Sequence, residues 1–277
     1  MTLAIGFFDG VHLGHRRILA GADAVLTFRN HPLSVISPSA APQLLMPADE
    51  RIALLRTVGA KVPRAVYAVR FTKRFASMSP EDFATYLRRE FPDLKKVHCG
   101  GNWRFGANGA GTPRSLRNFG FSVKVSRYAR CGDCVISSTR IRAALAEGDV
   151  DLANSMLGRR FSITGSVVSG KGIGCRMGAP TLNFEVDSVL KRGVYVVDTP
   201  FGRGVANYGI APTMCENSWK APVLEVHLLD VPEGSSIPVR GPMQVEFAKF
   251  LRPERKFKNS AALCKQIAAD IAGARKL

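Results

Sequence analysis

The sequence has no apolar run long enough to cross a lipid bilayer. Its beginning also lacks the basic region and long apolar core of a secretory signal peptide, so we expect a cytoplasmic protein with no membrane partner. Internal repeats and low-complexity segments are absent. What is present, 46% hydrophobic and 22% charged residues in 277 positions, is typical of a soluble globular protein large enough for two domains.

Acidic residues are scarce relative to basic ones. Lys and Arg number 39 against 22 Asp and Glu, which gives a formal net charge of +17. The excess is spread along the chain, +10 over residues 1–157 and +7 over residues 158–277. Such a field attracts nucleotides, pyrophosphate, nucleic acid or acidic membranes without selecting among them. A nucleic-acid-binding protein is one hypothesis, but the sequence contains no aromatic-plus-basic RNA motif, no helix-turn-helix signature and no zinc module.

Few cysteines have the close spacing that is typical of metal ligands. Only Cys131 and Cys134, in CGDC, have a ligand-like or redox-like spacing, and no other Cys or His pair supplies the second half of a zinc site. Because CGDC lies between β-rich stretches, Gly132 and Asp133 predict a hairpin turn, not the helix start of a thioredoxin motif. We expect the six thiols to be reduced and structural.

The first half of the chain alternates strand-like and helix-like segments. The predicted strands are residues 2–8, 24–28, 65–71, 95–101 and 121–125. The predicted helices are residues 47–60, 79–91, 137–148 and 149–158. Ser79 and Ser138 are the expected caps of two of them. This alternation is typical of a parallel sheet covered by helices.

From residue 160 onward the pattern changes to short β segments separated by Gly and Pro. Such a pattern predicts an antiparallel barrel or sandwich. One helix closes the chain over residues 260–277. The change predicts two domains, residues 1–157 and 158–277.

The stretch GFFDGVHLGH, residues 6–15, stands where the first predicted strand becomes a helix, which is where ligands bind in parallel α/β folds. A helix start offers unpaired backbone N–H groups that suit phosphate, and Gly10 and Gly14 allow close approach. His12 and His15 are three residues apart, so they can point to one side and donate hydrogen bonds to phosphate oxygens as negative charge builds up. The alternative is two surface histidines beside a glycine-rich turn.

This stretch resembles the first nucleotide-binding motif of the HxGH nucleotidyltransferase superfamily, and ISSTRIR, residues 136–142, resembles the second. With TFRNHP and RFG between them, the motifs are similar to one branch, the prokaryotic bifunctional riboflavin kinase/FMN adenylyltransferase family, also called FAD synthetase. The second half resembles the kinase module of that family through GAPTLNFEV, GVYVV, GVANYGIAPT, LEVHLLD and FLRPERKF. Together the motifs cover nearly the whole chain in the order of the family.

The resemblance implies a Rossmann-like α/β nucleotidyltransferase domain followed by an antiparallel β-barrel riboflavin kinase domain with a C-terminal helix. It implies two reactions. ATP phosphorylates riboflavin to FMN, and a second ATP adenylylates FMN to FAD with release of pyrophosphate. ATP is then a co-substrate and Mg²⁺ the implied cofactor, while riboflavin, FMN and ATP are the partners.

In the first half, the resemblance gives His12 and His15 catalytic roles at the triphosphate. The residues implied to bind the nucleotide and its phosphates are Gly6, Phe7, Asp9, Gly10, Gly14, Ser137, Ser138, Thr139 and Arg142. The residues implied to contact the flavin are Asn30, His31, Asn102 and Phe105, with Asn207 in the second half. Without its partner motif, SSTRIR is equally typical of an ordinary helix cap followed by basic side chains in solvent.

In the second half, Thr181 and Asn183 are two residues apart and share one face if the segment is a strand. Their hydroxyl and amide oxygens suit Mg²⁺, and the family gives both positions that role, although the residues alone also fit a polar strand edge. The catalytic base of the family matches Glu225 in LEVHLLD, where apolar and polar residues alternate. An isolated glutamate on a strand is otherwise a solvated surface residue.

One motif is misleading. GSVVSGK, residues 165–171, fits G-x-x-x-x-G-K, but residue 172 is Gly where a Walker P-loop needs Ser or Thr, and no helix pattern follows. By resemblance, these residues belong to a glycine-rich loop over the phosphates of ATP. The loop residues concerned are Gly170, Lys171, Gly172 and Gly174.

The chain departs from the family at four points. It begins almost directly at the first motif, and residues 16–26 leave room for a helix of one to two turns where relatives have a full helix. Asn102 and Ala211 stand where relatives often have Asp and Arg. A riboflavin kinase with a degenerate adenylyltransferase domain is therefore the second enzyme hypothesis.

Overall fold

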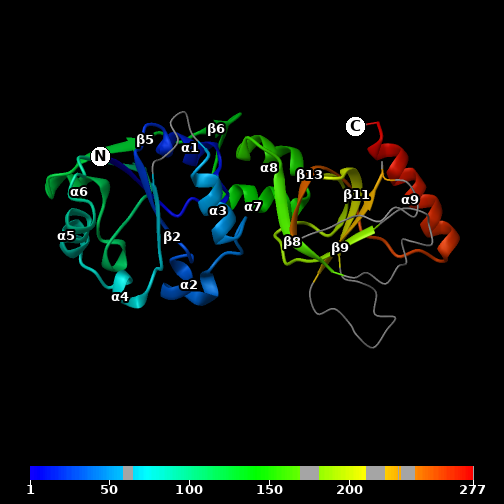
Figure 1. Cartoon of the computed structure of the whole chain (residues 1–277), viewed down its shortest axis with the longest axis horizontal. Helices are drawn as coiled ribbons and strands as arrows, with labels where there is room; N and C mark the ends of the chain where they lie inside the picture. Colours follow the sequence, from blue (N-terminus) through cyan, green and yellow to red (C-terminus); the bar gives the residue numbers. More distant parts are fainter. Residues whose placement is uncertain (59–64, 169–180, 210–221, 230, 232–240, 277) are drawn as a thin grey trace. The chain divides into compact units, whose positions relative to one another are not determined.

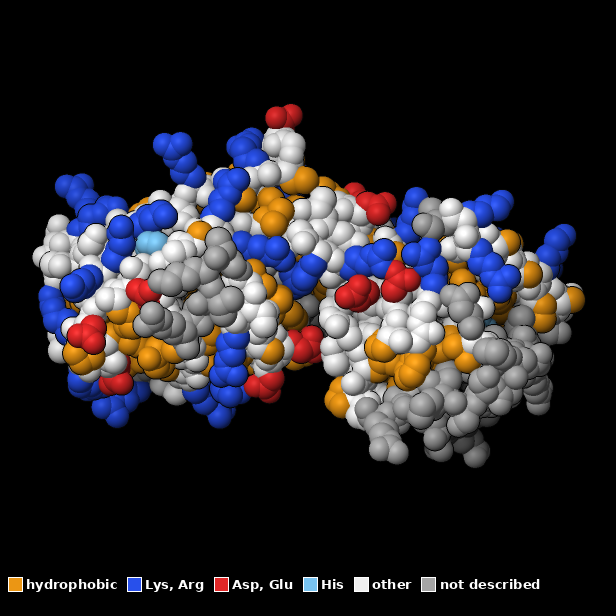
Figure 2. Space-filling model, turned by 45° about the horizontal axis from the view of Figure 1, so that its top comes forward, with side chains coloured by type: hydrophobic (Ala, Val, Ile, Leu, Met, Phe, Trp, Pro, Cys, Tyr) orange, Lys and Arg blue, Asp and Glu red, His pale blue; other side chains and the backbone are white. Residues whose placement is uncertain are grey.

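The computed structural model describes residues 1–58, 65–168, 181–209, 222–229, 231 and 241–276. The chain divides into two compact units, Met1–Ser138 and Thr139–Leu277, each of which is described by itself (Figure 1). No helix in the described residues is long and apolar enough to span a membrane. Lys and Arg side chains are spread over the visible face of each unit (Figure 2), as their distribution along the sequence predicts.

A five-stranded parallel sheet forms the centre of the first unit, with strand order β3-β2-β1-β4-β5. The strands are β1 (Thr2–Ile5), β2 (Ala24–Phe28), β3 (Ala65–Val69), β4 (Lys96–Gly100) and β5 (Ser122–Ser126). The α-helices are α1 (Leu13–Leu19), α2 (Leu33–Ile36), α3 (Ala48–Leu55), α4 (Lys73–Ala76), α5 (Pro80–Glu90) and α6 (Pro113–Asn118). Short 3-10 turns lie at Asp9–Val11, Pro38–Ala40 and Ala107–Gly109. All pairings in this sheet are parallel, which confirms the predicted α/β architecture.

Two hydrophobic cores cover the two faces of this sheet. Leu3 and Ile5 of β1 face the core that α5 and α6 complete, whereas Ala4, between them, faces the core that α1 and α3 complete. This alternation follows from the two-residue period of a strand. With both faces covered, the carboxyl ends of the strands are the edge where ligands bind in such sheets.

The helix ends follow the sequence with two corrections. Ser79 caps α5 as predicted, since its hydroxyl accepts the N–H of Asp82 at 3.0 Å and the Asp82 carboxylate accepts the N–H of Ser79. The helix predicted to reach residue 60 ends at Leu55. Ser138 is the first residue of α7 (Ser138–Glu147), whereas a cap is the residue before the helix. Its hydroxyl donates to the carbonyl of Asp9.

The CGDC segment forms the predicted hairpin. β6 (Arg130–Cys131) pairs with β7 (Cys134–Val135), and Gly132 adopts φ 55° in the turn. Cys99, Cys134 and Cys264 carry free thiols. Among the described residues, no group of three or more His, Cys, Asp and Glu side chains could hold a metal.

A closed barrel of six strands forms the second unit, in the order β10-β11-β12-β9-β8-β13. The strands are β8 (Phe161–Val168), β9 (Thr181–Glu185), β10 (Gly193–Thr199), β11 (Gly202–Gly209), β12 (Val223–Leu228) and β13 (Pro242–Pro253). The helices are α7, α8 (Val150–Leu157) and α9 (Ser260–Ala274). Every pairing is antiparallel, so the structure decides for a barrel where the sequence alone also allowed a sandwich.

Alternate residues of the barrel strands point inward. Phe184, Leu224 and Phe247 are fully buried there. Outside the barrel, α9 packs through Ala274 against a group of valines that includes Val196 of β10.

A buried ion pair attaches α9 to the barrel. Arg252 on β13 donates from Nη2 to the Asp270 carboxylate at 2.7 Å, and Gln266 donates to the same carboxylate at 2.8 Å. Both charged side chains are nearly buried, at 12% and 8% exposed. We expect Asp270→Asn to lower the free energy of unfolding of the barrel by about 3 kcal/mol, because the guanidinium is left buried without its counter-charge.

Urea unfolding followed by circular dichroism measures this loss. The control is Asp49→Asn, since the Asp49–Arg29 pair has the same chemistry but is 85% and 55% exposed. That variant is expected to lose at most about 1 kcal/mol. Equal losses in the two variants would show that burial of the Arg252–Asp270 pair does not matter.

The boundary between the units falls just after Ser138, the first residue of α7, whereas the domain boundary predicted from sequence follows Leu157. Asn154 of α8 is bonded to the barrel through both ends of its amide. Its Nδ2 donates to the carbonyl of Phe247 at 3.0 Å, and its Oδ1 accepts the N–H of Phe161 at 2.7 Å. The boundary after Leu157 stays a proposal that a comparison of fragments can test.

We expect a fragment of residues 139–277 to be more stable to urea than a fragment of residues 158–277, by at least about 2 kcal/mol. The shorter fragment loses both hydrogen bonds of Asn154, each worth about 1 kcal/mol, together with the apolar contacts of α8. Circular dichroism at increasing urea gives both unfolding curves. Coincident curves would favour the boundary after Leu157.

Candidate active sites

The carboxyl end of β1 runs into a loop with left-handed backbone geometry. Phe8, Gly10 and Val11 have φ of 60°, 76° and 41°. A non-glycine residue in this region costs roughly 1–2 kcal/mol, so neighbouring contacts must hold the loop in place. Asp9 supplies two of them: its carboxylate accepts the N–H of Leu45 at 3.0 Å, and its carbonyl accepts the hydroxyl of Ser138 at 2.9 Å. The loop therefore replaces the end of the predicted first strand, and buried Asp9 anchors it.

His12 and His15 lie together, as their spacing predicts. Their rings stack with centroids 3.5 Å apart and 18° between the planes. His12 is also the cap of α1, because its Nδ1 accepts the N–H of His15 at 3.2 Å. A Cβ on Gly14 would approach the His12 ring to 3.0 Å, which explains a glycine at this position. With Nδ1 accepting, the other nitrogen, Nε2, is the one that carries a proton and can donate it to a ligand.

The backbone N–H of His15 is therefore already bonded. The sequence predicted that unpaired N–H groups at the start of this helix would bind phosphate, but the His12 ring occupies this one. The capacity of the loop to bind phosphate then depends more on the imidazole N–H groups than on the helix start.

His15 is held in its neutral form. Burial is the largest cause that lowers its pKa well below the usual 6.5, and the neighbouring His12 and Arg51 lower it further. Its Nδ1 is buried with no hydrogen-bond partner among the described residues. A neutral imidazole has one N–H group, so His15 can donate one hydrogen bond to a ligand.

Arg51 is a residue that the sequence analysis did not single out. It lies on α3 with no exposed surface, and its Nη2 donates to the carbonyls of Phe28 and Arg29 at the end of β2. Its guanidinium lies 4.1 Å from the ring centre of Phe7. Burial lowers the pKa of Arg51, and the attraction of Asp9 opposes that shift. The periodicity of α3 drew attention to its apolar face, and nothing in the sequence marked this arginine as buried.

The second nucleotide motif reaches this loop through Ser138, which bonds to Asp9. Ser137 beside it is partly buried. Thr139 and Arg142 continue α7 in the second unit, where Arg142 Nη2 lies 3.4 Å from Thr139 Oγ1. A shared phosphate site for the histidines and these residues stays a proposal.

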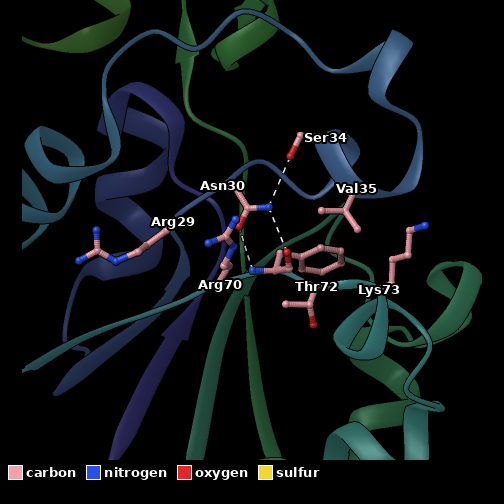
Figure 3. Close-up of a pocket in the computed structure, with 8 residues that line it drawn as sticks. Arg29, Asn30, Ser34, Val35, Arg70, Thr72 and Lys73 are labelled. Carbon is pink, nitrogen blue, oxygen red and sulfur yellow. Dashed lines mark hydrogen bonds between the residues drawn. The ribbon is translucent and has the colours of Figure 1, made fainter.

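A cavity of about 510 Å³ lies at the carboxyl ends of β2 and β3 (Figure 3). Its lining residues are Arg29, Asn30, Ser34, Val35, Arg70, Phe71, Thr72 and Lys73. Asn30 joins the two strand ends: its Nδ2 donates to the carbonyl of Phe71 and its Oδ1 accepts the N–H of Phe71, both at 3.0 Å. Asn30, which the resemblance assigns to the flavin, thus lines a cavity, and its amide is already used to shape the wall.

The other three flavin candidates of the first unit have different environments. His31 follows Asn30, accepts the N–H of Leu33 at 3.1 Å, and meets the Phe7 ring edge-on at 4.7 Å. Asn102 is exposed just beyond the carboxyl end of β4. Phe105 is 6% exposed and stacks with Trp103 in the core, at 4.9 Å between ring centres. Phe105 thus packs in the core, and its predicted contact with the flavin stays a prediction.

In the second unit, the register of the barrel brings four predicted site residues onto one outer face. Glu225 on β12 pairs with Asn183 on β9 and with Asn207 on β11. Two positions along, Thr181 pairs with His227. Residues directly opposite each other on neighbouring strands project to the same side of a sheet. The catalytic, metal-binding and flavin-binding candidates of this half therefore form one patch.

The electrostatics of the patch favour proton transfer. Glu225 lies at the outer surface, but partial desolvation by the surrounding protein raises its pKa from the usual 4.5. Burial lowers the pKa of His227, which keeps its imidazole neutral. Thr181 Oγ1 lies 3.2 Å from His227 Nδ1. A carboxylate with a raised pKa is a better proton acceptor than an ordinary one.

Glu254 is a second residue that the sequence analysis missed. Its side chain lies against Gly209, where any Cβ would collide with it, and it hydrogen-bonds with Asn207. Burial is the largest cause that raises its pKa. Glu254 belongs to FLRPERKF, one of the motifs that resemble the family, but the sequence analysis assigned it no role.

The patch fits Mg²⁺ in the manner of phosphate-transferring enzymes. Thr181 and Asn183 offer a neutral hydroxyl and an amide oxygen, and Asn183 is 9% exposed. Mg²⁺ in such enzymes takes one or two protein oxygens, with substrate phosphates and water as the other ligands. Gly170, Lys171, Gly172 and Gly174, predicted to cover the ATP phosphates, lie outside the described residues, as does Ala211.

Two family models match the chain. One described as FAD synthetase matches residues 1–140, and one described as riboflavin kinase matches residues 157–277. The chain is 33% identical to the bifunctional riboflavin kinase/FMN adenylyltransferase of Bacillus subtilis (strain 168), over 97% of this chain and 90% of the relative. The chain belongs to the bifunctional riboflavin kinase/FMN adenylyltransferase family.

Other members of the family are equally similar. The proteins of the same name from Escherichia coli (strain K12) and Pseudomonas fluorescens are each 34% identical over 99% of this chain, and cover 92% and 91% of the relatives. A crystal structure described as a macrolide-efflux protein from Streptococcus pneumoniae has a TM-score of 0.83 at 26% identity, over 100% of this chain and 94% of that one. The presence of both family domains favours the bifunctional interpretation over a kinase alone.

Proposed function

We propose that this chain phosphorylates riboflavin to FMN and then adenylylates FMN to FAD, with one ATP used in each step. The observation that carries the proposal is that the models of both family domains match the chain. Part of the predicted residue set of each domain supports it. His12 and His15 stack in the first unit. Asn183, Glu225 and Asn207 share one face of the barrel in the second.

In the kinase step, the riboflavin 5′-hydroxyl oxygen attacks the γ-phosphorus of ATP while Glu225 accepts the hydroxyl proton. The bond from the γ-phosphorus to the bridging oxygen breaks, and ADP leaves. Asn207, one strand away, is placed to orient the flavin chain. Thr181 and Asn183 hold Mg²⁺, which offsets the charge of the ATP phosphates. The raised pKa of Glu225 supports its role as the base.

In the adenylyl-transfer step, the FMN phosphate attacks the α-phosphorus of ATP and pyrophosphate leaves. No covalent intermediate is needed if both reactants are held in line. His12 and His15 donate hydrogen bonds to oxygens that gain charge, and Ser137, Thr139 and Arg142 bind the leaving phosphates. The flavin enters the cavity beside Asn30 and Phe71, with His31 and Asn102 at the same edge of the sheet. The protein acts in the cytoplasm in this proposal, where ATP is available.

The kinase-only hypothesis rested chiefly on the short segment after His15. α1 spans Leu13–Leu19, seven residues or about two turns, so it begins before His15 and extends into that segment as far as Leu19. The stacked histidine pair lies at its start. The shortened segment therefore does not displace the catalytic candidates.

Incubation of the purified protein with riboflavin, ATP and Mg²⁺ tests the proposal. Separation of riboflavin, FMN and FAD by chromatography over time is expected to show FMN first and FAD after it. A parallel incubation with FMN, ATP and Mg²⁺ is expected to give FAD and pyrophosphate in equal amounts. FMN that accumulates without FAD in both incubations would support the kinase-only hypothesis.

A further inference from the structure

His227 and Thr181 face each other across the β9–β12 pair. They are register partners on antiparallel strands, so their side chains leave the barrel on the same outer side. Thr181 Oγ1 and His227 Nδ1 are 3.2 Å apart, within hydrogen-bond distance. Both side chains are partly buried. Asn183 and Glu225 form the next register pair on the same outer face, two positions along the same two strands.

The direction of this hydrogen bond decides what the threonine oxygen can do. A hydroxyl has one proton and two lone pairs, and a neutral imidazole has one donor and one acceptor nitrogen. If Nδ1 accepts, the hydroxyl proton points at the histidine and the lone pairs face away from it. If Nδ1 donates, one lone pair points at the histidine and the proton faces away from it. The first arrangement suits a metal ligand better, because it keeps the proton away from the cation.

We propose that His227 is a positioning residue of the kinase site, which accepts the Thr181 hydroxyl proton and so directs the oxygen lone pairs at the magnesium of MgATP. The inference rests on the proposed function, in which Thr181 is a metal ligand. Groups that hold a ligand from behind are common around protein metal sites and fix the orientation of the ligand.

His227 is better suited to this role than to binding the metal itself. Mg²⁺ prefers oxygen ligands, whereas imidazole suits zinc, copper and iron. His227 Nδ1 is also within hydrogen-bond distance of Thr181 Oγ1. The histidine therefore affects the metal through the threonine, and its loss is repaired by any side chain that places an acceptor at the Nδ1 position.

Three variants of the full chain test this role. His227→Leu removes the acceptor, His227→Asn retains an oxygen near the Nδ1 position, and Thr181→Val removes the hydroxyl. The readout is the binding of Mn²⁺ to the protein–ADP complex, measured from the electron paramagnetic resonance signal of free Mn²⁺. The unfolding midpoint of each variant is measured alongside, so that a folding defect is recognised.

We expect His227→Leu to weaken Mn²⁺ binding about tenfold, the lower end of the range for such positioning groups. His227→Asn is expected to stay within about threefold of the parent, and Thr181→Val to weaken binding at least as much as His227→Leu. In the double variant, His227→Leu should add nothing to Thr181→Val, because the histidine acts only through the threonine. The Mg²⁺ concentration for half-maximal phosphorylation should rise in parallel, with kcat largely recovered at high Mg²⁺.

The outcomes distinguish the role of Thr181 as a metal ligand from the role of His227 as its positioning residue. If Thr181→Val leaves Mn²⁺ binding unchanged, Thr181 is not a metal ligand, and both that part of the proposed function and this inference fail. If Thr181→Val weakens binding but His227→Leu does not, only the positioning role is overturned. The same holds if the two effects add in the double variant, or if His227→Asn is as defective as His227→Leu.

Discussion

Replacing Glu225 by Gln is expected to slow riboflavin phosphorylation by about 10²–10⁴-fold, the usual contribution of a general base. The substitution preserves the shape of the side chain and its place between Asn183 and Asn207, but the amide cannot accept the proton of the 5′-hydroxyl. The conversion of supplied FMN to FAD, which needs only the first-half residues, is expected to be unchanged. Product formation from riboflavin and from FMN, assayed separately, measures both rates.

The pH dependence of the kinase rate is a second test of the role of Glu225. A base is active only when ionised, so the kinase rate rises as pH increases through its pKa. Because burial raises the pKa of Glu225, the acid limb is expected above pH 4.5, and Glu225→Gln should abolish that limb. The matched control is Glu246→Gln on β13, which changes a carboxylate of the same barrel opposite Asp198. A normal rate in Glu225→Gln would place the base elsewhere and contradict our interpretation of LEVHLLD.

Replacing His15 by Ala is expected to cut FMN adenylylation at least tenfold and to leave riboflavin phosphorylation near normal. A hydrogen bond to a charged phosphate is worth about 1.5–3 kcal/mol, and a tenfold rate corresponds to about 1.4 kcal/mol. In His15→Ala, the His12 ring also loses its stacking partner. His12→Ala disrupts the same pair, so we expect it to give a similar loss of adenylylation. The initial rate of pyrophosphate release from FMN and ATP is the direct measurement.

His15→Asn serves as the comparison for His15→Ala. Asparagine keeps a side-chain N–H donor, so part of the activity lost in the alanine variant should return. Because His15 is neutral in the folded protein, its own ionisation should not produce a pH limb near neutrality in the parent. Equal damage to both reactions in His15→Ala would contradict separate sites.

Most of the fold could be predicted from the sequence where periodicity is strong. The segment of residues 24–28 became β2 with those bounds, because a short apolar run in a buried parallel strand has clear ends. The sequence did not decide between a barrel and a sandwich. Closure of the barrel depends on the pairing of β10 with β13, two strands that are far apart in the sequence. Local alternation contains no information about that pairing.

Site residues could be predicted where they belong to one motif in one stretch of sequence. Contacts between residues that are far apart in the sequence could not be predicted. The contact between His12 and His15 could be predicted because they are three positions apart, with His12 as the cap of α1 and His15 in its first turn. Arg51 was missed because its burial comes from the folding of α3 onto Phe7. Phe105, predicted to contact the flavin, packs against Trp103 in the core, a contact that the sequence does not indicate. The His227–Thr181 contact depends on strand register, which the sequence does not specify.

The central claim is that the two reactions occur at separate sites of one chain, and a complementation assay tests it most directly. His15→Ala is expected to convert riboflavin to FMN with little FAD, and Glu225→Gln to make little FMN from riboflavin. Mixed together with riboflavin, ATP and Mg²⁺, the two variants are expected to form FAD at a rate comparable with the parent, because FMN released by one reaches the intact site of the other. A mixture that makes no more FAD than either variant alone would contradict the account.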